Sequence, residues 1–220
     1  MLKVVVFDGG YGGEFFADKL AEALPVIEII RVIDWRNAEK ILSSPRAARK
    51  TAETALRPYI GRVDLIIFAN HLLTLTSLRY FRRKYKKQNF IGLNLKAPET
   101  FIKNDVLILT TSAVSRTMRY RLFTFRLRRH IATLNVDSWP IKIDDGELTE
   151  QEVAETINNA LINKKASPKE VILACSQFND IKPALRKALG HNLKIYESFD
   201  DAIRQTCKVL RIRGGVNKKK

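Results

Sequence analysis

The chain has 220 residues, which suits one large α/β domain or two of about 100 residues each with a substantial core. With 45% hydrophobic and 28% charged residues it has an ordinary globular composition, and no apolar run approaches the ~20 residues of a membrane helix. The formal net charge of +16 permits attraction to nucleic acid, anionic membrane surfaces or acidic small molecules, but it carries no information about the fold.

Cysteine usage and the N-terminal residues indicate a reducing compartment. Cys175 and Cys207 have neither the spacing of a disulfide framework nor that of a metal site, so we predict no metal. A strand begins almost at the N-terminus and leaves no room for a signal peptide. We therefore expect a cytoplasmic protein with no membrane partner.

The first half of the chain alternates apolar runs with amphipathic stretches. Strands are predicted at 3–7, 28–33, 63–68 and 90–95, and helices at about 14–24, at 45–56 and up to about 87. Ser44 is placed to cap the second helix, with Pro45 at its first position. The crossing into the second half is predicted at 96–98.

A glycine-rich turn at 8–13 (Asp-Gly-Gly-Tyr-Gly-Gly) joins the first strand to the first helix. Glycines permit positive φ and a close approach of the backbone to a ligand. The turn does not match Gly-x-Gly-x-x-Gly, because Phe15 occupies the last position, and it lacks a Gly-Lys-Ser/Thr ending. These departures argue against a nucleotide-binding regulator and favour a site for a small anion, with Asp8 at the strand tip.

The second half repeats the alternation. Strands are predicted at 106–109, 131–136, 171–175 and 193–196, and helices from about 115 and over about 150–163, 181–189 and 200–210. Thr149 and Glu152 form a capping box for the second of these helices. Asn179 or Asp180 is placed to cap the third, with Pro183 in its first turn.

This alternation predicts parallel sheets covered by helices on both faces. The segments 64–71 and 170–177 have the same shape, and their register sets Ala69 opposite Cys175 and Asn70 opposite Ser176. We therefore predict an α/β fold of two pseudo-symmetric domains, 1–96 and 97–198, with a cleft between them. In this scheme a helix at 199–212 packs back on the first domain, and 213–220 forms a basic tail.

Cys175 is the residue on which the functional interpretation depends. It follows an apolar strand, and open α/β sheets bind ligands at the carboxyl ends of their strands. Exposed amides at the start of the following helix would favour its thiolate. The alternative is a buried small hydrophobe, which is how we interpret Cys207 on the apolar stripe of the last helix.

Several short motifs, in this order, resemble those of the glutamate racemase group of the aspartate/glutamate racemase superfamily. The segment 8–13 resembles the family's opening Asp-Ser-Gly-x-Gly-Gly, and 69–71 (Ala-Asn-His) stands where the family has Cys-Asn-Thr. The segment 109–113 (Leu-Thr-Thr-Ser-Ala) resembles its Ala-Thr-x-Gly-Thr turn, and 139–146 its Pro-Leu-Val-Glu-x-Gly segment. Finally, 174–179 (Ala-Cys-Ser-Gln-Phe-Asn) stands for Gly-Cys-Thr-His-Tyr-Pro.

The resemblance implies a cofactor-independent isomerase acting on a small carboxylate or amino acid, linked in the family to peptidoglycan precursors. In the family two cysteines flank the α-carbon, one as thiolate base and the other as acid on the opposite face. Here Cys175 is retained and Ala69 replaces the other thiol, so inversion by two thiols is not expected. Asp8 matches the family's acid beside the first cysteine. The substrate-binding residues implied by the matched motifs are Gly9, Gly10, Asn70, Thr111, Ser176 and Gln177.

His71 offers a substitute for the missing thiol, since a Cys175/His71 acid–base pair would again supply two proton-transferring groups. The alternative is a helix-start or core histidine with no catalytic role. Gly9 replaces a serine that holds substrate in the family, and Gln177 replaces the histidine beside the second cysteine. The family's Pro-Tyr-Gly loop after the second strand has no counterpart here. Homodimers are usual in the family, but the sequence shows no interface.

A second hypothesis is a non-catalytic protein of this fold that binds nucleic acid or an acidic partner. Basic residues cluster at 79–87, at 116–129 and at 211–220, and their attraction to phosphates would depend steeply on salt. Aromatic residues that interleave with these charges could stack bases, namely Tyr80, Phe81, Tyr85, Tyr120 and Phe125. The commoner arrangement places such aromatics in the core and the charges in water.

Overall fold

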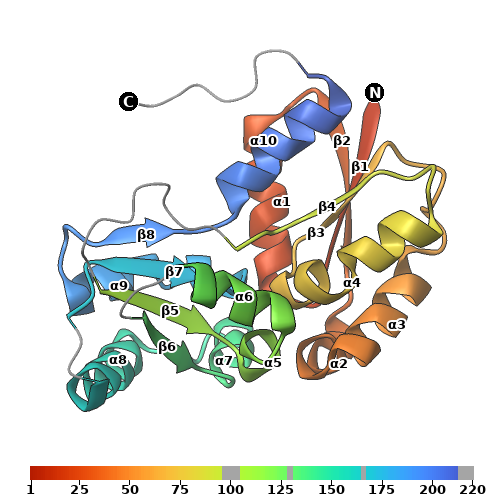
Figure 1. The fold of residues 1–220 in the computed structure, drawn as a ribbon. Coiled ribbons are helices and arrows are strands. Elements are labelled where there is room, and N and C mark those ends of the chain that lie inside the picture. Colours follow the sequence, from red (N-terminus) through yellow and green to blue (C-terminus); the bar gives the residue numbers. More distant parts are fainter. Residues whose placement is uncertain (96–104, 128–130, 165–166, 213–220) are drawn as a thin grey trace. The chain divides into compact units, whose positions relative to one another are not determined.

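The apolar run Val4–Phe7 forms the fully buried centre of strand β1 (Leu2–Asp8). The computed structural model describes residues 1–95, 105–127, 131–164 and 167–212 and divides into two units (Figure 1). Unit 1 comprises Met1–Asn94 with the described segment from Ser198 onward, and unit 2 the described part of Leu95–Glu197. The predicted crossing at 96–98 and the predicted tail at 213–220 lie outside the described residues.

Unit 1 is built on a four-stranded parallel sheet with the order β2-β1-β3-β4. After β1 the strands are β2 (Ile27–Ile33), β3 (Leu65–Phe68) and β4 (Phe90–Gly92); the helices are α1 (Tyr11–Ala23), α2 (Ala38–Ser43), α3 (Pro45–Leu56), α4 (His71–Lys84) and α10 (Phe199–Leu210), and the short turn η1 (Trp35–Asn37) precedes α2. Right-handed crossovers place α1 on one face and α3 with α4 on the other. On the first face, side chains of α1 and α10 pack with those of the strands, as Phe16, Phe199 and Ile67 do.

Unit 2 repeats the design with the parallel order β6-β5-β7-β8. Its strands are β5 (Val106–Thr110), β6 (Ile131–Asn135), β7 (Glu170–Leu173) and β8 (Lys194–Tyr196), and its helices are α5 (Ser112–Ser115), α6 (Met118–Leu127), α7 (Trp139–Asp144), α8 (Glu150–Lys164) and α9 (Lys182–Leu189), with the turn η2 (Gln177–Asn179) after β7. Its main core joins strand residues such as Leu107 and Leu173 to Trp139, Ile157 and Phe178 from the helices and turn.

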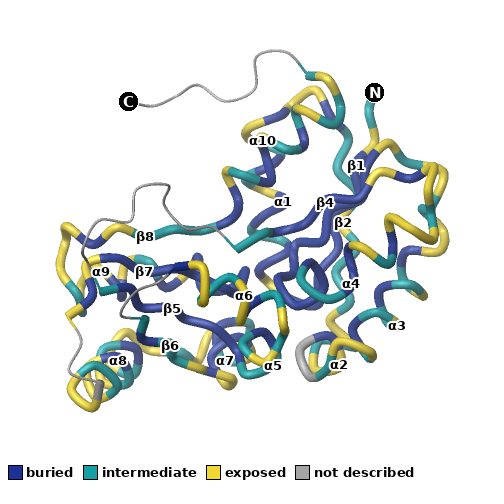
Figure 2. Tube along the Cα trace, viewed as in Figure 1, coloured by how far each residue is buried: buried dark blue, intermediate teal, exposed yellow. Residues whose placement is uncertain are grey.

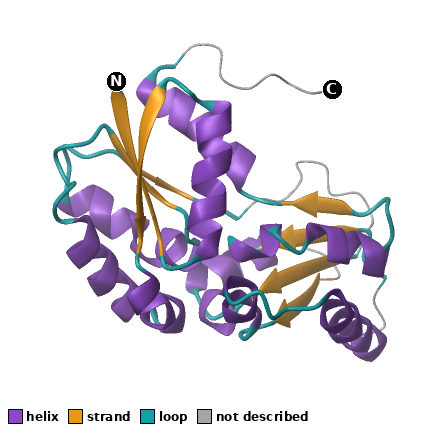
Figure 3. Cartoon of the chain, turned by 180° about the vertical axis from the view of Figure 1, so that it is seen from behind, coloured by secondary structure: helices purple, strands orange, loops and turns teal. Residues whose placement is uncertain are grey.

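The α/β architecture with two parallel sheets flanked by helices is confirmed, and Figure 3 shows the helices against the strands. The central strands β3, β5 and β7 are buried throughout, and β1 is buried from Val4 onward, as Figure 2 shows, because their helices shield both sides from water. Within the described residues no helix is both long enough and apolar enough to cross a bilayer.

Two predicted helix starts are confirmed by hydrogen bonds. The Ser44 hydroxyl accepts from the Ala47 amide at 3.2 Å at the start of α3, where Pro45 is the first residue. The Thr149 hydroxyl accepts from the Glu152 amide at 3.1 Å at the start of α8. In both helices the cap satisfies an amide that the first turn leaves without an intrahelical partner.

The predicted cap of the helix after Cys175 is wrong. The turn η2 separates β7 from α9, so the residue before α9 is Ile181, which has no capping side chain. Asn179 instead donates from Nδ2 to the Ser176 carbonyl at 3.1 Å within that turn. Pro183 does lie in the first turn of α9. Two helices, α2 and α7, were not predicted. The helix predicted from about residue 115 is divided into α5 and α6. Arg128 and Arg129, which were predicted on that helix, lie outside the described residues.

Candidate functional site

In unit 1 the predicted residues Asp8 and Asn70 lie together at the carboxyl ends of β1 and β3. Asp8 is 1% exposed, and its Oδ1 accepts from the Gly9 amide at 2.7 Å and from Asn70 Nδ2 at 3.0 Å. The other end of the Asn70 amide, Oδ1, accepts from the Leu73 amide at 3.0 Å and caps α4. Asn70 therefore links the Asp8 carboxylate to the start of α4, and both ends of its side chain have partners.

The glycines after Asp8 let two helices approach the strand end. A Cβ at Gly13 would lie 2.4 Å from Asp8 Cβ and 2.8 Å from Ile33 Cδ1, so only glycine fits there. A Cβ at Gly9 would lie 3.0 Å from Ile41 Cδ1 and 3.3 Å from the backbone of Ala38. Helix α2 therefore covers the side of Gly9 on which the resembled family carries its serine. Gly10 is buried and precedes α1.

His71 is placed as the first residue of α4 and is 3% exposed. Its Nε2 lies 3.0 Å from Ser198 Oγ, and the Ser198 hydroxyl donates to the Asn94 carbonyl at 2.5 Å. Because that hydroxyl has one proton, Nε2–H of His71 is the donor to Oγ, and the ring is the neutral Nε2–H tautomer. Burial lowers the pKa of His71 to about 3. These contacts favour the helix-start alternative for His71 over the catalytic prediction.

The remaining ring nitrogen, His71 Nδ1, is buried and has no hydrogen-bond partner within the described residues. In the neutral tautomer it is an acceptor, and a buried acceptor without a partner costs free energy. The arrangement joins the start of α4 to the residues that precede α10 and follow β4, all within unit 1. Sequence reasoning missed Ser198, because its partners are distant along the chain.

In unit 2 three predicted residues meet directly after β7. Cys175 is 6% exposed, and its Sγ–H donates to Gln177 Oε1 at 3.0 Å. The Ser176 hydroxyl donates to the same oxygen at 3.1 Å. This arrangement binds the protonated thiol, since a thiolate has no proton to donate. Turning the Gln177 amide about its terminal torsion would bring its NH₂ group to the sulfur, where it could donate to the thiolate.

Thr111 lies at the end of the neighbouring strand β5, where it is 6% exposed. Its carbonyl accepts from the amides of Val114 and Ser115, and its side chain makes no capping hydrogen bond. The start of α5 is held instead by Asp137, whose carboxylate accepts from the Ser112 amide at 2.7 Å and the Ser112 hydroxyl at 2.6 Å. Asp137 was not among the predicted site residues.

The predicted register between the two halves is off by one residue. The Ala69 amide donates to the carbonyl of Phe7, and the matching bond in unit 2 runs from Ala174 to Leu109, both at 2.9 Å. The neighbouring strands give the same correspondence. The Asp34 amide donates to the Asp8 carbonyl, and the Val136 amide donates to the Thr110 carbonyl. Ala69 thus corresponds to Ala174, and Asn70 to Cys175.

The acidic residues at the strand starts caused this error, since Asp64 and Glu170 look equivalent in the sequence. Glu170 lies inside its ladder, paired with Val106, and is 5% exposed. Asp64 precedes β3, whose first pair is Leu65 with Val4. The structure therefore matches Leu65, not Asp64, to Glu170.

The described residues include no group of three His, Cys, Asp or Glu side chains positioned to hold a metal ion. Cys207 packs against the unit 1 core from α10, as predicted, and burial raises the pKa of its thiol. Among the described residues, Cys175 is therefore the thiol that stands with polar groups at a strand end.

Of the five aromatic residues on the basic helices that could stack bases, Phe125 alone is exposed. Phe81 and Tyr120 are buried, so the prediction that they stack bases is wrong, and the core alternative holds for them. Tyr80 carries the Arg49 guanidinium 4.7 Å from its ring centroid. Tyr85 donates to Glu53 Oε1 at 2.6 Å, and Lys84 bonds to the same carboxylate. Hydrogen bonds from Lys84 and Tyr85 lower the pKa of Glu53.

The fold described above is shared with solved glutamate racemases, and curated glutamate racemases are similar to the chain in sequence. No family model matches the chain. Glutamate racemases of Buchnera aphidicola subsp. Acyrthosiphon pisum, strains APS and Tuc7, are 21% identical over 214 residues, which cover 92% of this chain and 80% of theirs.

Solved structures of glutamate racemases have the same fold. The Escherichia coli enzyme, in complex with L-glutamate and the activator UDP-MurNAc-Ala, superposes with a TM-score of 0.82 at 18% identity, over 96% of this chain and 83% of its own. The Francisella tularensis enzyme in complex with D-glutamate has a TM-score of 0.78 at 20% identity, over 100% and 84%. Allantoin racemase from Klebsiella pneumoniae has a TM-score of 0.56 at 14% identity, over 100% and 91%.

Proposed function

We propose that the chain is a cofactor-independent isomerase of the glutamate racemase kind, with Cys175 as its acid/base group and a small amino acid or related carboxylate as substrate. The observation that carries the proposal is the thiol at the carboxyl end of β7, hydrogen-bonded to Gln177, in a fold shared with glutamate racemases. Two of those racemases were solved with L- or D-glutamate, which supports a 2-amino acid as the substrate class.

The reaction cycle follows the protonation state of the Cys175 thiol. The thiol first loses its proton to solvent, and the Gln177 amide turns to donate to the thiolate. The thiolate then removes the α-proton of the substrate, and the electron pair of the C–H bond passes into the α-carboxylate system. Return of a proton from the same thiol closes the cycle. If the thiol has exchanged with solvent in between, the product carries the solvent isotope at the α-carbon.

A single thiol predicts exchange without inversion. Ala69 has no ionisable group, and in unit 1 its methyl packs in the core at 0% exposure. Asp8 and Asn70 are bonded to each other, so their side chains serve primarily to shape the strand end. A catalytic thiol must stay unoxidised, which a reducing compartment favours, and this supports a cytoplasmic location.

The test is α-proton exchange in D₂O with glutamate, aspartate and a panel of small 2-substituted acids. NMR follows loss of the α-proton signal and chiral chromatography follows inversion. Cys175→Ala should lower the exchange rate at least about a hundredfold, the size expected for loss of a positioned acid/base. Cys207→Ala is the matched control, since its thiol lies in the unit 1 core, and it should retain the full rate.

Exchange that persists in Cys175→Ala would remove the thiol from the mechanism. An absence of exchange with every acid tested would overturn the isomerase proposal. Inversion at the rate of exchange would show that a second proton-transferring group is present, against the one-thiol mechanism.

A further inference from the structure

Helix α6 presents an apolar stripe to solvent. Met118 is 77% exposed, Leu122 50% and Phe125 77%. Their spacing places all three on one side of the helix. Single exposed apolar residues are ordinary in proteins, but a row of three on one helix is a feature of interaction surfaces.

The opposite side of α6 fixes the direction of this stripe. Tyr120 and Leu127 are buried at 4% and 6% exposure, and Tyr120 Oη lies 2.9 Å from Thr133 Oγ1 on β6. Burial raises the pKa of Tyr120 to about 12, so the hydroxyl stays neutral and hydrogen-bonded. The helix is thus anchored to its own sheet, and the stripe cannot turn inward without breaking that anchor.

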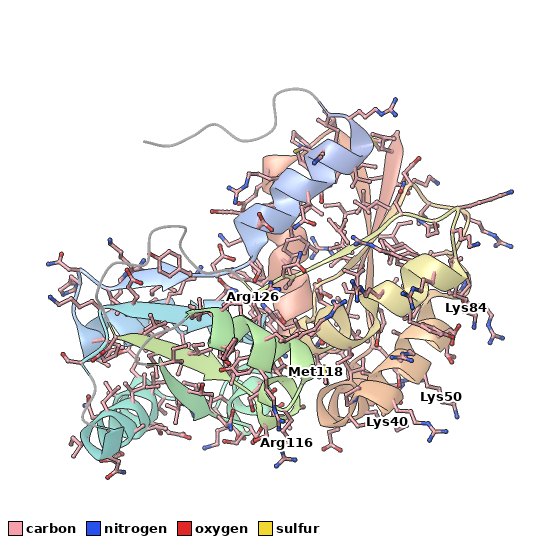
Figure 4. All side chains as sticks on the ribbon, viewed as in Figure 1. Lys40, Lys50, Lys84, Arg116, Met118 and Arg126 are labelled. Carbon is pink, nitrogen blue, oxygen red and sulfur yellow. The ribbon has the colours of Figure 1, made fainter. Side chains whose placement is uncertain are left out.

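Arginines border the stripe on both sides. Arg116, Arg121 and Arg126 are exposed, and within the described residues none of the three forms an ion pair. Figure 4 shows Arg116, Met118 and Arg126 spaced along this segment. From Val106 to Val136 the sequence contains no acidic residue, so nothing local neutralises the guanidinium groups. The result is an apolar ridge with a cationic border.

We propose that this α6 ridge binds the surface of an anionic lipid bilayer. Such a surface offers phosphates for the arginines and hydrocarbon for Met118, Leu122 and Phe125 at the depth where interfacial helices bury their apolar face. A second copy of the same ridge would bring the arginines of both copies together. Nucleic acid would pair with the arginines, but it provides no apolar partner for two aliphatic side chains. The inference does not depend on the proposed isomerase activity, and it replaces the expectation, drawn from the sequence, of no membrane partner.

Co-sedimentation of the full chain with vesicles tests the apolar stripe. Vesicles of phosphatidylcholine in which about one lipid in three is the anionic phosphatidylglycerol should bind the protein. Vesicles of pure phosphatidylcholine should bind it far more weakly. Phe125→Asp should weaken binding at least about tenfold, since it places a charge in the inserted stripe. Ile162→Asp is the matched control, because Ile162 is 73% exposed on α8 of the same unit, and it should bind as the wild type.

The cationic border is tested by the triple variant Arg116→Gln, Arg121→Gln, Arg126→Gln. Each lost charge should weaken binding about fivefold, so the triple variant should lose about a hundredfold. A control triple variant at three other exposed basic residues of unit 2 should lose much less: Arg186→Gln, Lys187→Gln and Lys194→Gln.

Circular dichroism melting curves establish that each variant is folded. Equal weakening by the two triple variants would mean attraction by net charge alone and would overturn the proposal. So would unchanged vesicle binding by Phe125→Asp. Binding to single-stranded RNA that exceeds vesicle binding and survives Phe125→Asp would assign the arginines to a nucleic acid instead.

Discussion

Unit 1 and unit 2 have the same strand order and matching hydrogen bonds at the ends of their central strands, yet different side chains follow those bonds. At matched positions unit 1 has Asn70, which caps a helix and binds Asp8, and unit 2 has Cys175, whose thiol donates to Gln177 Oε1. Asn70 links the end of β1 to the start of α4, whereas the bond from Cys175 to Gln177 stays within one turn. The difference indicates that Asn70 stabilises the fold, whereas Cys175 carries a thiol, a group that can transfer protons.

The largest effect is expected from closing the space beside Asp8. Gly13→Ala should lower the free energy of unfolding by about 3 kcal/mol, because the new Cβ would lie 2.4 Å from Asp8 Cβ and the strand or helix must move. Ser115→Ala, at the end of the helix α5 that follows β5 in unit 2, should change it by no more than about 0.5 kcal/mol. Urea unfolding measures both. Similar losses in the two variants would contradict the tight packing that distinguishes unit 1.

The matched strand-end residues provide a second, smaller contrast. Asn70→Ala removes the α4 cap and a partner of Asp8, and should cost about 2 kcal/mol. Cys175→Ala removes a small thiol and its hydrogen bond to Gln177, and should cost about 1 kcal/mol or less. Urea unfolding at neutral pH compares the two variants. A larger loss for Cys175→Ala would show that the thiol is structural and would weaken its catalytic assignment.

His71 adds a pH dependence that belongs to unit 1. Burial lowers its pKa from 6.5 to about 3, so between these values the unfolded chain binds a proton that the folded chain does not. Stability from this residue is therefore complete above pH 6.5 and falls as the pH is lowered, by about 1.4 kcal/mol per pH unit well inside the window. His71→Gln, which keeps a donor for Ser198, should flatten the unfolding free energy between pH 6 and 5 by about 1 kcal/mol.

The control variant is His191→Gln, which makes the same replacement at an exposed histidine of unit 2. Urea unfolding of the wild type and both variants at a series of pH values provides the comparison. If the unfolding free energies of the wild type and of His71→Gln changed in parallel with pH, His71 would accept its proton as readily in the folded chain as in the unfolded one.

Strands and capped helices could be predicted because their signals are local. The Val4–Phe7 run and the Ser44–Pro45 pair determine their structures through neighbours along the chain. Asn70 has a comparable signal as a cap before an apolar helix, and it could have been recognised as one. The Ser198–His71 bond has no such signal, because the two residues meet only through folding.

The register error has the same origin. Asp64 and Glu170 are both acidic residues that precede an apolar run, so they look equivalent in the sequence. Only the strand pairing shows that Glu170 lies inside its strand, whereas Asp64 precedes β3. The contacts of the candidate site residues could not be predicted, because Asp8 with Asn70, Cys175 with Gln177, and α2 over Gly9 are all set by packing.

The smallest effect is expected from Ala69→Cys, which places a thiol where the resembled family carries one. The ladder matches Ala69 to Ala174 instead of Cys175, and its methyl is buried among core residues such as Val6 and Phe16. A thiol there should behave as a small buried hydrophobe, so the free energy of unfolding should change by less than about 1 kcal/mol. Exchange in D₂O should proceed at the parent rate with no inversion, as chiral chromatography would record. Inversion in this variant would instead show that position 69 takes part in the reaction.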